Sequence, residues 1–271
     1  MRVVIFILIL SSCISCKKEV GAAGPQGPAG NTGPNGISTN DTGTISGKLA
    51  VYNEFSNKEN DFSGAIVTMS SGNLTVKDTS DAAGAYQFRG LPTGTYNFTY
   101  EKPGYGMYKI FGVSHIPTGT NETEVQDVYL MQIPIKTAVK KISLVETAYS
   151  TSVGIYLDSS LSNVQYFQDF VIIVGKDENV NINTAVKTYE TGFTDGKNYY
   201  TYQLSKNLIR VFFHPGENAY VKVATYIHRI LTGVGPNMLD IGAASYYIDP
   251  DTGNYVYPDM SVSPNALRII L

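Results

Sequence analysis

From Thr44 onward the chain alternates apolar and polar positions in short runs, which turn residues interrupt roughly every 8 to 12 positions. Successive side chains of a β-strand point to opposite faces, so this period of two predicts strands with one buried face. In the first half of the chain, the expected strands cover residues 44–52, 64–69, 74–78, 85–88, 95–100 and 125–131. No amphipathic helical stretch of convincing length interrupts them, and the pattern is typical of a small β-sandwich.

A second set of runs, rich in β-branched residues and tyrosine, begins at Pro134. Its expected strands cover residues 138–146, 151–157, 166–174, 185–189, 199–204, 209–213, 220–230, 244–248 and 267–271. Asp195-Gly196 and the segment from Asp251 to Asn254 are typical of hairpin turns. The sequence therefore predicts an all-β fold with two tandem antiparallel β-sandwiches, one at residues 44–132 and one at residues 133–271.

The first residues differ from this pattern. Residues 3–10 form an unbroken apolar run behind a single arginine, and this run is too short to span a hydrocarbon core of about 30 Å. It is typical of the hydrophobic part of a signal peptide. Residues 1–15 are therefore expected to be removed on export.

Two cysteines follow the apolar run. The segment from Leu10 to Cys16 resembles the lipobox of bacterial lipoproteins, in which a cysteine is acylated and becomes the mature N-terminus. Cys13 matches the lipobox position by position, whereas Lys17-Lys18-Glu19 makes Cys16 similar to the start of many mature Bacteroidota lipoproteins and favours Cys16. The resemblance implies a chain that its lipid holds on the bacterial outer membrane or cell surface, since two or more acyl chains suffice for stable anchoring.

Residues 16–43 are expected to be a disordered spacer. Glycine occupies every third position from Gly21 to Gly36, with proline directly after three of these glycines. This is the collagen-like Gly-X-Y repeat, in which only glycine fits the axis of a triple helix. Two interpretations remain: a semi-rigid stalk on a monomer, which the proline and glycine content already explains, or an element that makes the chain a trimer. The shortness of the repeat favours the stalk.

Residues 44–132 carry three landmarks of a known fold. They are Gly47-Lys48-Leu49, Gly64-Ala65-Ile66-Val67 and, above all, the segment from Ser80 to Tyr96 with its turn at Gly84. Together they resemble the carboxypeptidase regulatory-like domain, a transthyretin-like β-sandwich. In that family the domain accompanies a peptidase or a transporter barrel, and neither companion is recognisable here. The resemblance therefore implies a fold and not a peptidase activity. The polar insertion from Asn53 to Phe62 departs from the family pattern.

The second half carries one weaker resemblance. The segment from Phe213 to Ala224 contains a Pro215-Gly216 turn before Tyr220 and an alternating strand. It is similar to the corner of fibronectin type III domains, in which a tyrosine hydroxyl bonds back to the chain. The resemblance implies that the Tyr220 hydroxyl makes such a bond.

Composition and charge remove several classes of function. A formal net charge of −3 gives no electrostatic case for a nucleic-acid partner. No cysteine follows Cys16, which excludes a disulfide framework, a cysteine nucleophile and a zinc–thiolate site in the folded part. The histidines are His115, His214 and His228, none with a partner at metal-ligand spacing, and no G-x-S-x-G elbow occurs. We therefore expect no catalytic residue, no metal site and no cofactor, and a chain that is not an enzyme.

Two features could still bind a ligand. The segment from Asp249 to Asn254 offers alternating oxygen atoms, as a calcium loop would, but Gly253 stands where a ligand belongs, and a plain hairpin turn explains the segment more simply. Tyrosine is abundant, and exposed rings stack on sugars or anchor protein partners. The expected ligand-contacting aromatics are Tyr199, Tyr200, Tyr246 and Tyr247. Alternation along a strand turns about half of such residues into the core.

The sequence as a whole favours a membrane-anchored, exported lipoprotein that acts as a non-catalytic interaction or adhesion module. The alternative is a glycan-binding accessory lipoprotein of an outer-membrane uptake system. In either case the partners are the membrane, through the N-terminal lipid, and a protein or glycan that the sequence does not identify.

Overall fold

The structure is a computed structural model in which most of the folded region is described. It describes residues 41–117, 122–161, 168–193, 197–226, 231–232, 239–240 and 246–271. Both candidate lipidation cysteines, Cys13 and Cys16, and the Gly-X-Y repeat lie outside these ranges, as does His228. The regular secondary structure of the described residues is almost entirely β-strand, which confirms the expected fold class. Within these ranges no helix has the length and apolarity that a membrane crossing requires.

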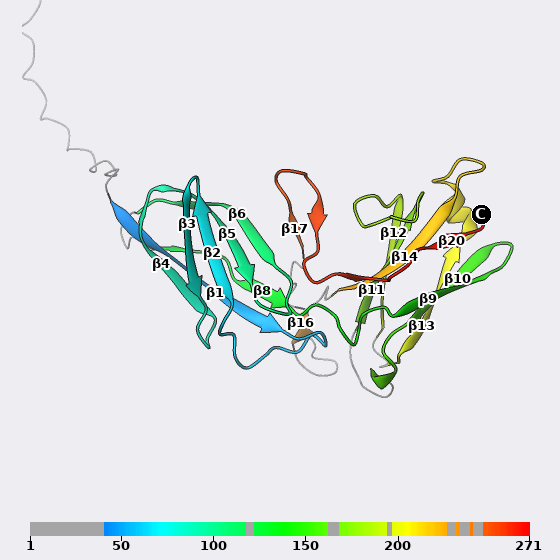
Figure 1. Ribbon diagram of the computed structural model, residues 1–271, viewed down its shortest axis with the longest axis horizontal. Coiled ribbons are helices and arrows are strands. Elements are labelled where there is room, and N and C mark those ends of the chain that lie inside the picture. Colours follow the sequence, from blue (N-terminus) through cyan, green and yellow to red (C-terminus); the bar gives the residue numbers. More distant parts are fainter. Residues whose placement is uncertain are drawn as a thin grey trace, which may run out of the picture. The chain divides into compact units, whose positions relative to one another are not determined.

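The first sandwich consists of two sheets (Figure 1). Its strands are β1 (Thr42–Tyr52), β2 (Ile66–Ser71), β3 (Leu74–Thr79), β4 (Ala85–Pro92), β5 (Gly94–Glu101), β6 (Tyr108–His115), β7 (Glu122–Glu124) and β8 (Val128–Met131). One sheet has the order β4-β1-β7, with β8 also paired to β1, and the other has the order β3-β2-β5-β6. All six strands predicted in this region occur, at nearly the expected positions.

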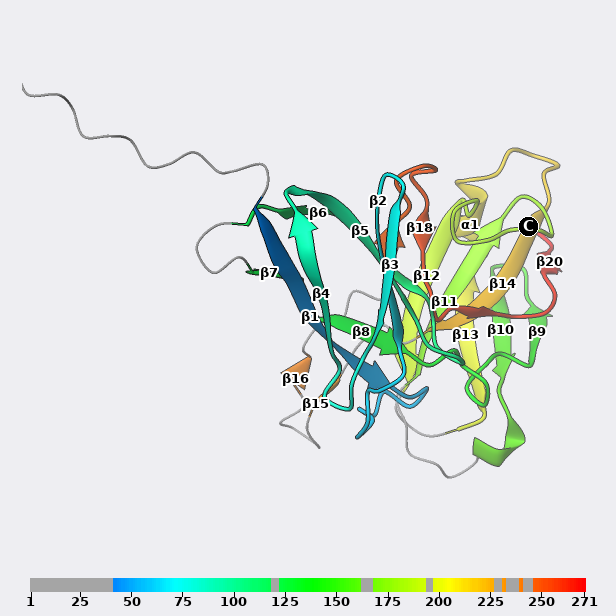
Figure 2. The ribbon, with the colours of Figure 1, turned by 60° about the vertical axis from the view of Figure 1, so that its left-hand side comes forward.

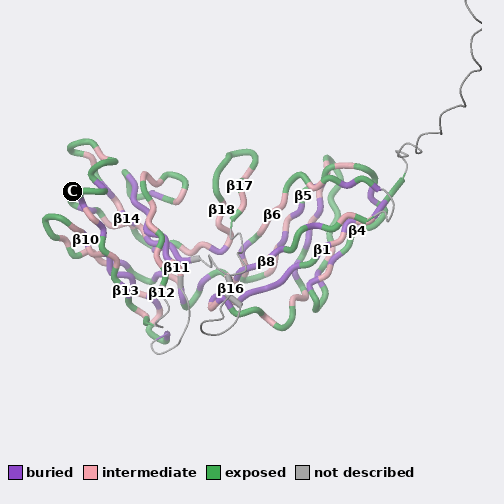
Figure 3. Tube along the Cα trace, turned by 180° about the vertical axis from the view of Figure 1, so that it is seen from behind, coloured by how far each residue is buried: buried purple, intermediate pink, exposed green. Residues whose placement is uncertain are grey.

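The core of this sandwich follows from the alternation. Ile45 and Val51 of β1 belong to one buried cluster with Phe98 and Tyr100 of β5. Buried stretches run along β1 and β5 (Figure 3). The hydroxyls of Tyr86 and Tyr100 lie 2.7 Å apart inside it. Burial raises the pKa of Tyr86 to about 12 and raises that of Tyr100 as well. Each hydroxyl thus satisfies the other in an otherwise apolar interior.

The backbone conformation of the turn before β4 requires glycine at position 84. Its φ is +81°, a conformation that L side chains rarely adopt. A Cβ at this position would also collide with the carbonyl oxygen of Leu49. The Leu49 N–H donates to the Gly84 carbonyl oxygen at 3.0 Å, so the turn lies directly against β1. Glycine therefore allows this turn to pack on the sheet.

Two details of the first sandwich differ from the prediction. β7 and β8 run parallel to β1, so this sheet is mixed and not purely antiparallel (Figure 2). The reason is topological: after β6 the chain passes to the other sheet and runs alongside β1 in the same direction. The strand β6 was not predicted, because a bulge at Gly112, with φ +73°, breaks its alternation. The Asn97 side chain accepts the Gly112 N–H there at 2.9 Å.

The second sandwich also consists of two sheets. Its elements are β9 (Lys141–Glu146), β10 (Ser150–Tyr156), the 3₁₀ turn η1 (Ser159–Leu161), β11 (Gln168–Gly175), β12 (Lys187–Phe193), β13 (Tyr199–Ser205), α1 (Lys206–Arg210), β14 (Ala219–Tyr226), β15 (Leu231–Thr232), β16 (Leu239–Asp240), β17 (Tyr247–Ile248), β18 (Tyr255–Val256), β19 (Ser261–Val262) and β20 (Leu267–Ile269). One sheet has the order β13-β10-β9, and the other β12-β11-β14-β19, with β20 also paired to β14. Two short hairpins, β15–β16 and β17–β18, stand apart from these sheets.

The core of the second sandwich explains its longest apolar run. The side chains from Phe170 to Val174 in β11 are all buried. Phe170 and Ile172 belong to the cluster between the two sheets, whereas Val171 and Ile173 pack with Val180 on the opposite face. A strand covered on both faces loses the alternation that an exposed face would impose.

Two expectations for this half are wrong. Residues 209–213 were predicted as a strand, but Lys206–Arg210 form a short helix that a turn follows. The helix buries Lys206, whose ammonium pairs with the Glu146 carboxylate at 3.0 Å, together with Ile209. The apolar residues of this segment are therefore partly buried, as the pattern indicated, but the buried positions are spaced as in a helical turn and not as in a strand.

The second error concerns Tyr220. Ala219 and Val221 are fully buried, so alternation turns Tyr220 to the other face of β14. Within the described residues no hydrogen bond of its hydroxyl occurs, so the corner expected from the fibronectin type III resemblance is not formed. The Pro215-Gly216 turn itself is present, with Gly216 at φ +89°.

Candidate functional site

The β17–β18 hairpin brings two exposed tyrosines together: Tyr246, directly before β17, and Tyr255 in β18. Its register pairs Tyr247 with Val256 and Ile248 with Tyr255. The Asn183 side chain, from the loop before β12, pairs with the Tyr255 backbone through two hydrogen bonds, as a neighbouring strand would. The Tyr255 N–H donates to Asn183 Oδ1, and Asn183 Nδ2 donates to the Tyr255 carbonyl oxygen, both at 3.1 Å. The hairpin is thereby fixed to the second sandwich at its C-terminal strand.

The turn of this hairpin uses the oxygens that could have bound calcium. Asp249 Oδ1 accepts from the N–H groups of Asp251 and Thr252, both at 3.0 Å, and from the Thr252 hydroxyl at 3.1 Å. These bonds hold the pKa of Asp249 below its usual range. Among the described residues no group of three or more His, Cys, Asp or Glu side chains lies in position to hold a metal. The segment is a hairpin turn, as the simpler of its two interpretations predicted.

The aromatic residues of this region form two groups of neighbouring rings, one around Tyr246 and one around Tyr247, which we together call the hairpin aromatic surface. It consists of Tyr108, Phe111, Tyr246, Tyr247, Tyr255 and Tyr257. The Tyr246 ring centroid lies 5.5 Å from those of both Tyr255 and Tyr257. Tyr255 is 49% exposed, and Tyr246 is also exposed. Several ring faces and edges are therefore available to a partner at one place.

The remaining rings support the exposed ones. Tyr247 packs edge-on against Tyr108, with ring centroids 5.9 Å apart, and lies 6.0 Å from Phe111. Burial raises the pKa of Tyr108, Tyr247 and Tyr257. The carboxylates of Asp249 and Glu190 contribute to this rise at Tyr247 and Tyr257, so acidic groups lie beside the rings. Such edge-to-face contacts hold the rings in defined positions.

The four predicted ligand-contacting tyrosines separate into three groups. Tyr246 and Tyr247 lie in the hairpin aromatic surface. Tyr199 is exposed on the outer face of β13. Tyr200 is a correction: it is 4% exposed, and its ring packs in the core 5.4 Å from Phe170. Adjacent strand residues point to opposite faces, so Tyr199 and Tyr200 could not both be exposed.

The sequence-based selection did not include four members of the surface, namely Tyr108, Phe111, Tyr255 and Tyr257. The hairpin signal from Asp251 to Asn254 could have found Tyr255, because it places this residue opposite Ile248 and beside Tyr246. Phe111 had no such signal, because it lies in β6, more than a hundred residues earlier in the chain.

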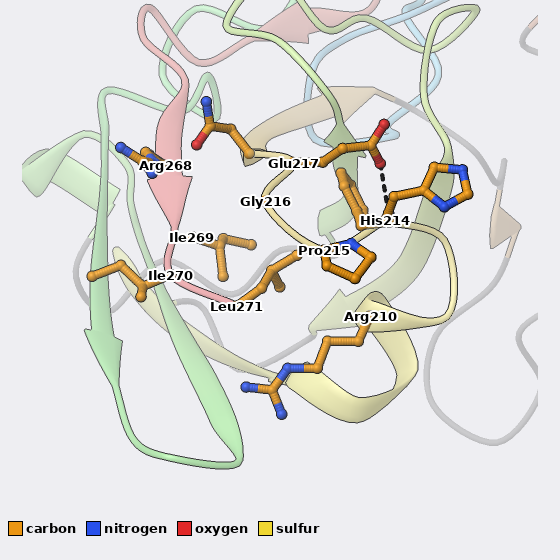
Figure 4. Close-up of a pocket in the computed structure, with 11 residues that line it drawn as sticks. Arg210, His214, Pro215, Gly216, Glu217, Arg268, Ile269, Ile270 and Leu271 are labelled. Carbon is orange, nitrogen blue, oxygen red and sulfur yellow. Dashed lines mark hydrogen bonds between the residues drawn. The ribbon is translucent and has the colours of Figure 1, made fainter.

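A separate hollow of about 440 Å³ lies beside His214 (Figure 4). Its lining includes Arg210, Phe213, Glu217 and Arg268. The Glu217 carboxylate accepts the backbone N–H of His214 at 2.7 Å and pairs with Lys176, which together lower its pKa. The Glu217 carboxylate thus bonds to the backbone amide of His214 and to Lys176, and not to the His214 imidazole. Within the described ranges, no carboxylate hydrogen-bonds to the His214 imidazole.

The other described histidine is structural. His115 is fully buried, its Nδ1 lies 2.7 Å from the Thr123 hydroxyl, and its ring packs edge-on against Tyr96. Its Nδ1 is partnered, while its Nε2 is buried without a hydrogen-bond partner among the described residues. Neither described histidine thus belongs to a recognisable catalytic arrangement.

Comparison with known proteins gives only distant similarities. No protein family and no curated protein matches this sequence. Among solved structures, a candidate carbohydrate-binding protein from Bacteroides uniformis is 13% identical, with 84% of this chain and 99% of that chain covered and a TM-score of 0.34. A DUF3823 family protein from Parabacteroides merdae is 12% identical over 68% of this chain and 90% of its own, with a TM-score of 0.27. The major pilin SpaD from Corynebacterium diphtheriae is 10% identical over 86% of this chain and 66% of its own, with a TM-score of 0.29. Any function assigned to this chain therefore has to rest on its own residues.

Proposed function

We propose that this chain is an exported lipoprotein, anchored at the bacterial outer membrane or cell surface, whose two β-sandwiches act as a non-enzymatic interaction or adhesion module. The apolar run at residues 3–10 and the lipobox-like segment ending at Cys16, with Cys13 as the alternative, support the anchor. The glycine-rich repeat supports a monomer raised on a stalk. Light scattering on the full chain tests this part, and a trimer that dissociates when residues 21–36 are deleted would contradict it.

The hairpin aromatic surface is the observation that carries the proposed binding role. Tyrosine buries a large area on binding and loses little conformational freedom, so clusters of it are typical of interaction surfaces. Tyr246 and Tyr255 are exposed, while their ring neighbours already hold them in place. A surface ordered before binding needs less ordering in the complex.

The absence of an enzymatic role is part of the same proposal. Of the described histidines, His115 is enclosed in the core, and the Glu217 carboxylate beside His214 bonds to a backbone amide and to Lys176. These arrangements favour structural roles for the groups that could have moved a proton.

Site-directed photocrosslinking on the full chain tests the binding role. A photoreactive phenylalanine analogue at Tyr255 should give a discrete adduct in cells that display the protein. The same analogue at Leu208, which is exposed on α1, serves as the matched control and should give none. Equal adducts at both positions, or none at Tyr255, would contradict the proposal.

The alternative is a glycan-binding accessory lipoprotein of an outer-membrane uptake system. Exposed tyrosine rings with uncharged polar groups beside them favour it, and Tyr199 has such surroundings. A glycan array probed with the full chain distinguishes the two: glycan retention together with an unlabelled Tyr255 position would favour the alternative.

A further inference from the structure

The outer face of the β13-β10-β9 sheet carries two tyrosines directly opposite each other. The register pairs Tyr156 of β10 with Tyr199 of β13. Their neighbours Ile155 and Tyr200 point into the core, so alternation turns both tyrosines outward. Tyr199 is 43% exposed and Tyr156 is half-buried. The sheet therefore presents aromatic rings at a place that is separate from the hairpin aromatic surface.

The two rings form a platform, and a glycine makes it possible. Their centroids lie 4.6 Å apart, with 41° between the ring planes. A Cβ on Gly154 would lie 3.2 Å from both the Cε2 and the hydroxyl of Tyr199, and 2.5 Å from the Ser143 Oγ. The Tyr199 ring thus lies across the bare backbone of Gly154. A side chain at that position would require the Ser143 hydroxyl to move and the Tyr199 ring to shift by a few tenths of an ångström.

Polar groups that donate and accept hydrogen bonds surround the platform. Lys141 Nζ lies 5.5 Å from the centroid of the Tyr156 ring, and the Ser143 hydroxyl donates to the Tyr156 hydroxyl across a long 3.5 Å. Alternation and register place further neutral polar side chains on the same face, namely Ser152, Thr201 and Gln203. Two rings inclined to each other by 41° are thereby bordered by hydroxyls, an amide, one ammonium and the exposed Val145.

We propose that the platform of Tyr156 and Tyr199 binds a pyranose ring of a glycan chain. One face of a pyranose presents C–H groups that stack on an aromatic ring, while its edges carry hydroxyls that need hydrogen-bond partners. The platform matches both requirements, because the rings lie on the sheet and the polar groups surround them. A protein partner would instead favour a larger apolar centre than two rings beside serine, threonine and glutamine.

A glycan array followed by titration tests this proposal on the full chain. The array should carry oligosaccharides of neutral and of uronic-acid pyranoses, and the chain should retain at least one of them. Because the sequence contains no tryptophan, tyrosine emission can follow the titration with that oligosaccharide. Tyr199→Ala removes the ring and should weaken glycan affinity at least tenfold, which corresponds to about 1.4 kcal/mol. Tyr199→Phe keeps the ring, so its affinity should stay within about threefold of that of the unchanged protein.

Two further variants separate binding from folding. Tyr149→Ala removes a 75% exposed tyrosine in the turn between β9 and β10 and should leave affinity unchanged. Gly154→Ala keeps both rings but shifts Tyr199 slightly, and it should weaken binding by less than Tyr199→Ala does, with thermal unfolding measured for each variant. A flat array, or equal affinity of Tyr199→Ala and the unchanged protein, would overturn the proposal. If Tyr255→Ala abolished glycan binding and Tyr199→Ala did not, the proposal would also be overturned. A failure of the glycan proposal would leave the expected crosslinking at Tyr255 unchanged, so the two proposals can fail separately.

Discussion

Glu54 accepts two hydrogen bonds from Thr137 through a single carboxylate oxygen. Its Oε2 receives the Thr137 N–H at 2.9 Å and the Thr137 hydroxyl at 3.1 Å, and also the N–H groups of Ile135 and Lys136. Glu54 is buried and belongs to the polar insertion after β1 that departs from the carboxypeptidase regulatory-like pattern. The insertion therefore holds the segment that leaves β8, because one carboxylate oxygen satisfies several backbone donors that would otherwise be unpaired.

Replacing this carboxylate should destabilise the protein. We expect Glu54→Ala to lower the free energy of unfolding by about 3 kcal/mol, because it leaves buried N–H groups without an acceptor. Denaturant unfolding followed by circular dichroism measures the change. Glu178→Ala, at an exposed position, is the matched control and should stay within about 0.5 kcal/mol of the unchanged protein. Equal stability of the two variants would show that the Glu54 contacts contribute nothing.

Removing the Asn183 side chain should release the β17–β18 hairpin without unfolding the sandwiches. Asn183→Ala loses both bonds to the Tyr255 backbone, which are solvent-exposed and contribute little to global stability. We expect faster amide hydrogen exchange at Tyr255 and an unchanged melting temperature. Asn179→Ala, at an exposed position of the same loop, should leave amide hydrogen exchange at Tyr255 unchanged. If Asn183→Ala did the same, another contact would have to hold the hairpin.

The buried hydroxyl pair of Tyr86 and Tyr100 should make the protein sensitive to alkali. In the unfolded chain the Tyr86 phenol titrates at its ordinary pKa of 10.0, whereas burial raises this pKa to about 12 in the folded state. Between these values the unfolded state releases a proton that the folded state keeps, so stability is complete below pH 10 and falls as the pH rises. The expected loss from Tyr86 is about 3 kcal/mol.

Urea unfolding at a series of pH values measures this loss. A double variant with phenylalanine at both positions keeps the packing and removes both titrating hydroxyls. Its stability should depend less on pH above 10 than that of the unchanged protein. Identical pH profiles of the two proteins would refute the role of this pair.

The lipid should reside on Cys16. In cells given a labelled fatty acid, we expect Cys16→Ala to abolish incorporation and Cys13→Ala to retain it, because only a cysteine at the processing site is acylated. Mass spectrometry of the mature N-terminal peptide gives the same assignment independently. The opposite pattern would assign the lipid to Cys13, and labelling of both variants alike would argue against a lipoprotein.

Local patterns in the sequence determined most of the strands of the first sandwich and the positions of its turns. Alternation of apolar and polar residues from Thr44 to Tyr52 needs no distant partner to be recognised, because the strand period is a property of the backbone. Gly84 and the hairpin signal at Asp251 to Asn254 were equally readable, since turn chemistry depends on a few neighbouring residues.

Tertiary structure alone decided which faces meet. Tyr199 and Tyr200 have the same side chain and adjacent positions, yet only packing of the β13-β10-β9 sheet on Phe170 makes one of them core and the other surface. The joining of Glu54 to Thr137 spans more than eighty residues and leaves no local trace in the sequence. Alternation along a strand determines that neighbouring side chains point to opposite faces. Which face is buried depends on the second sheet, and contacts between distant parts of the chain set the position of that sheet.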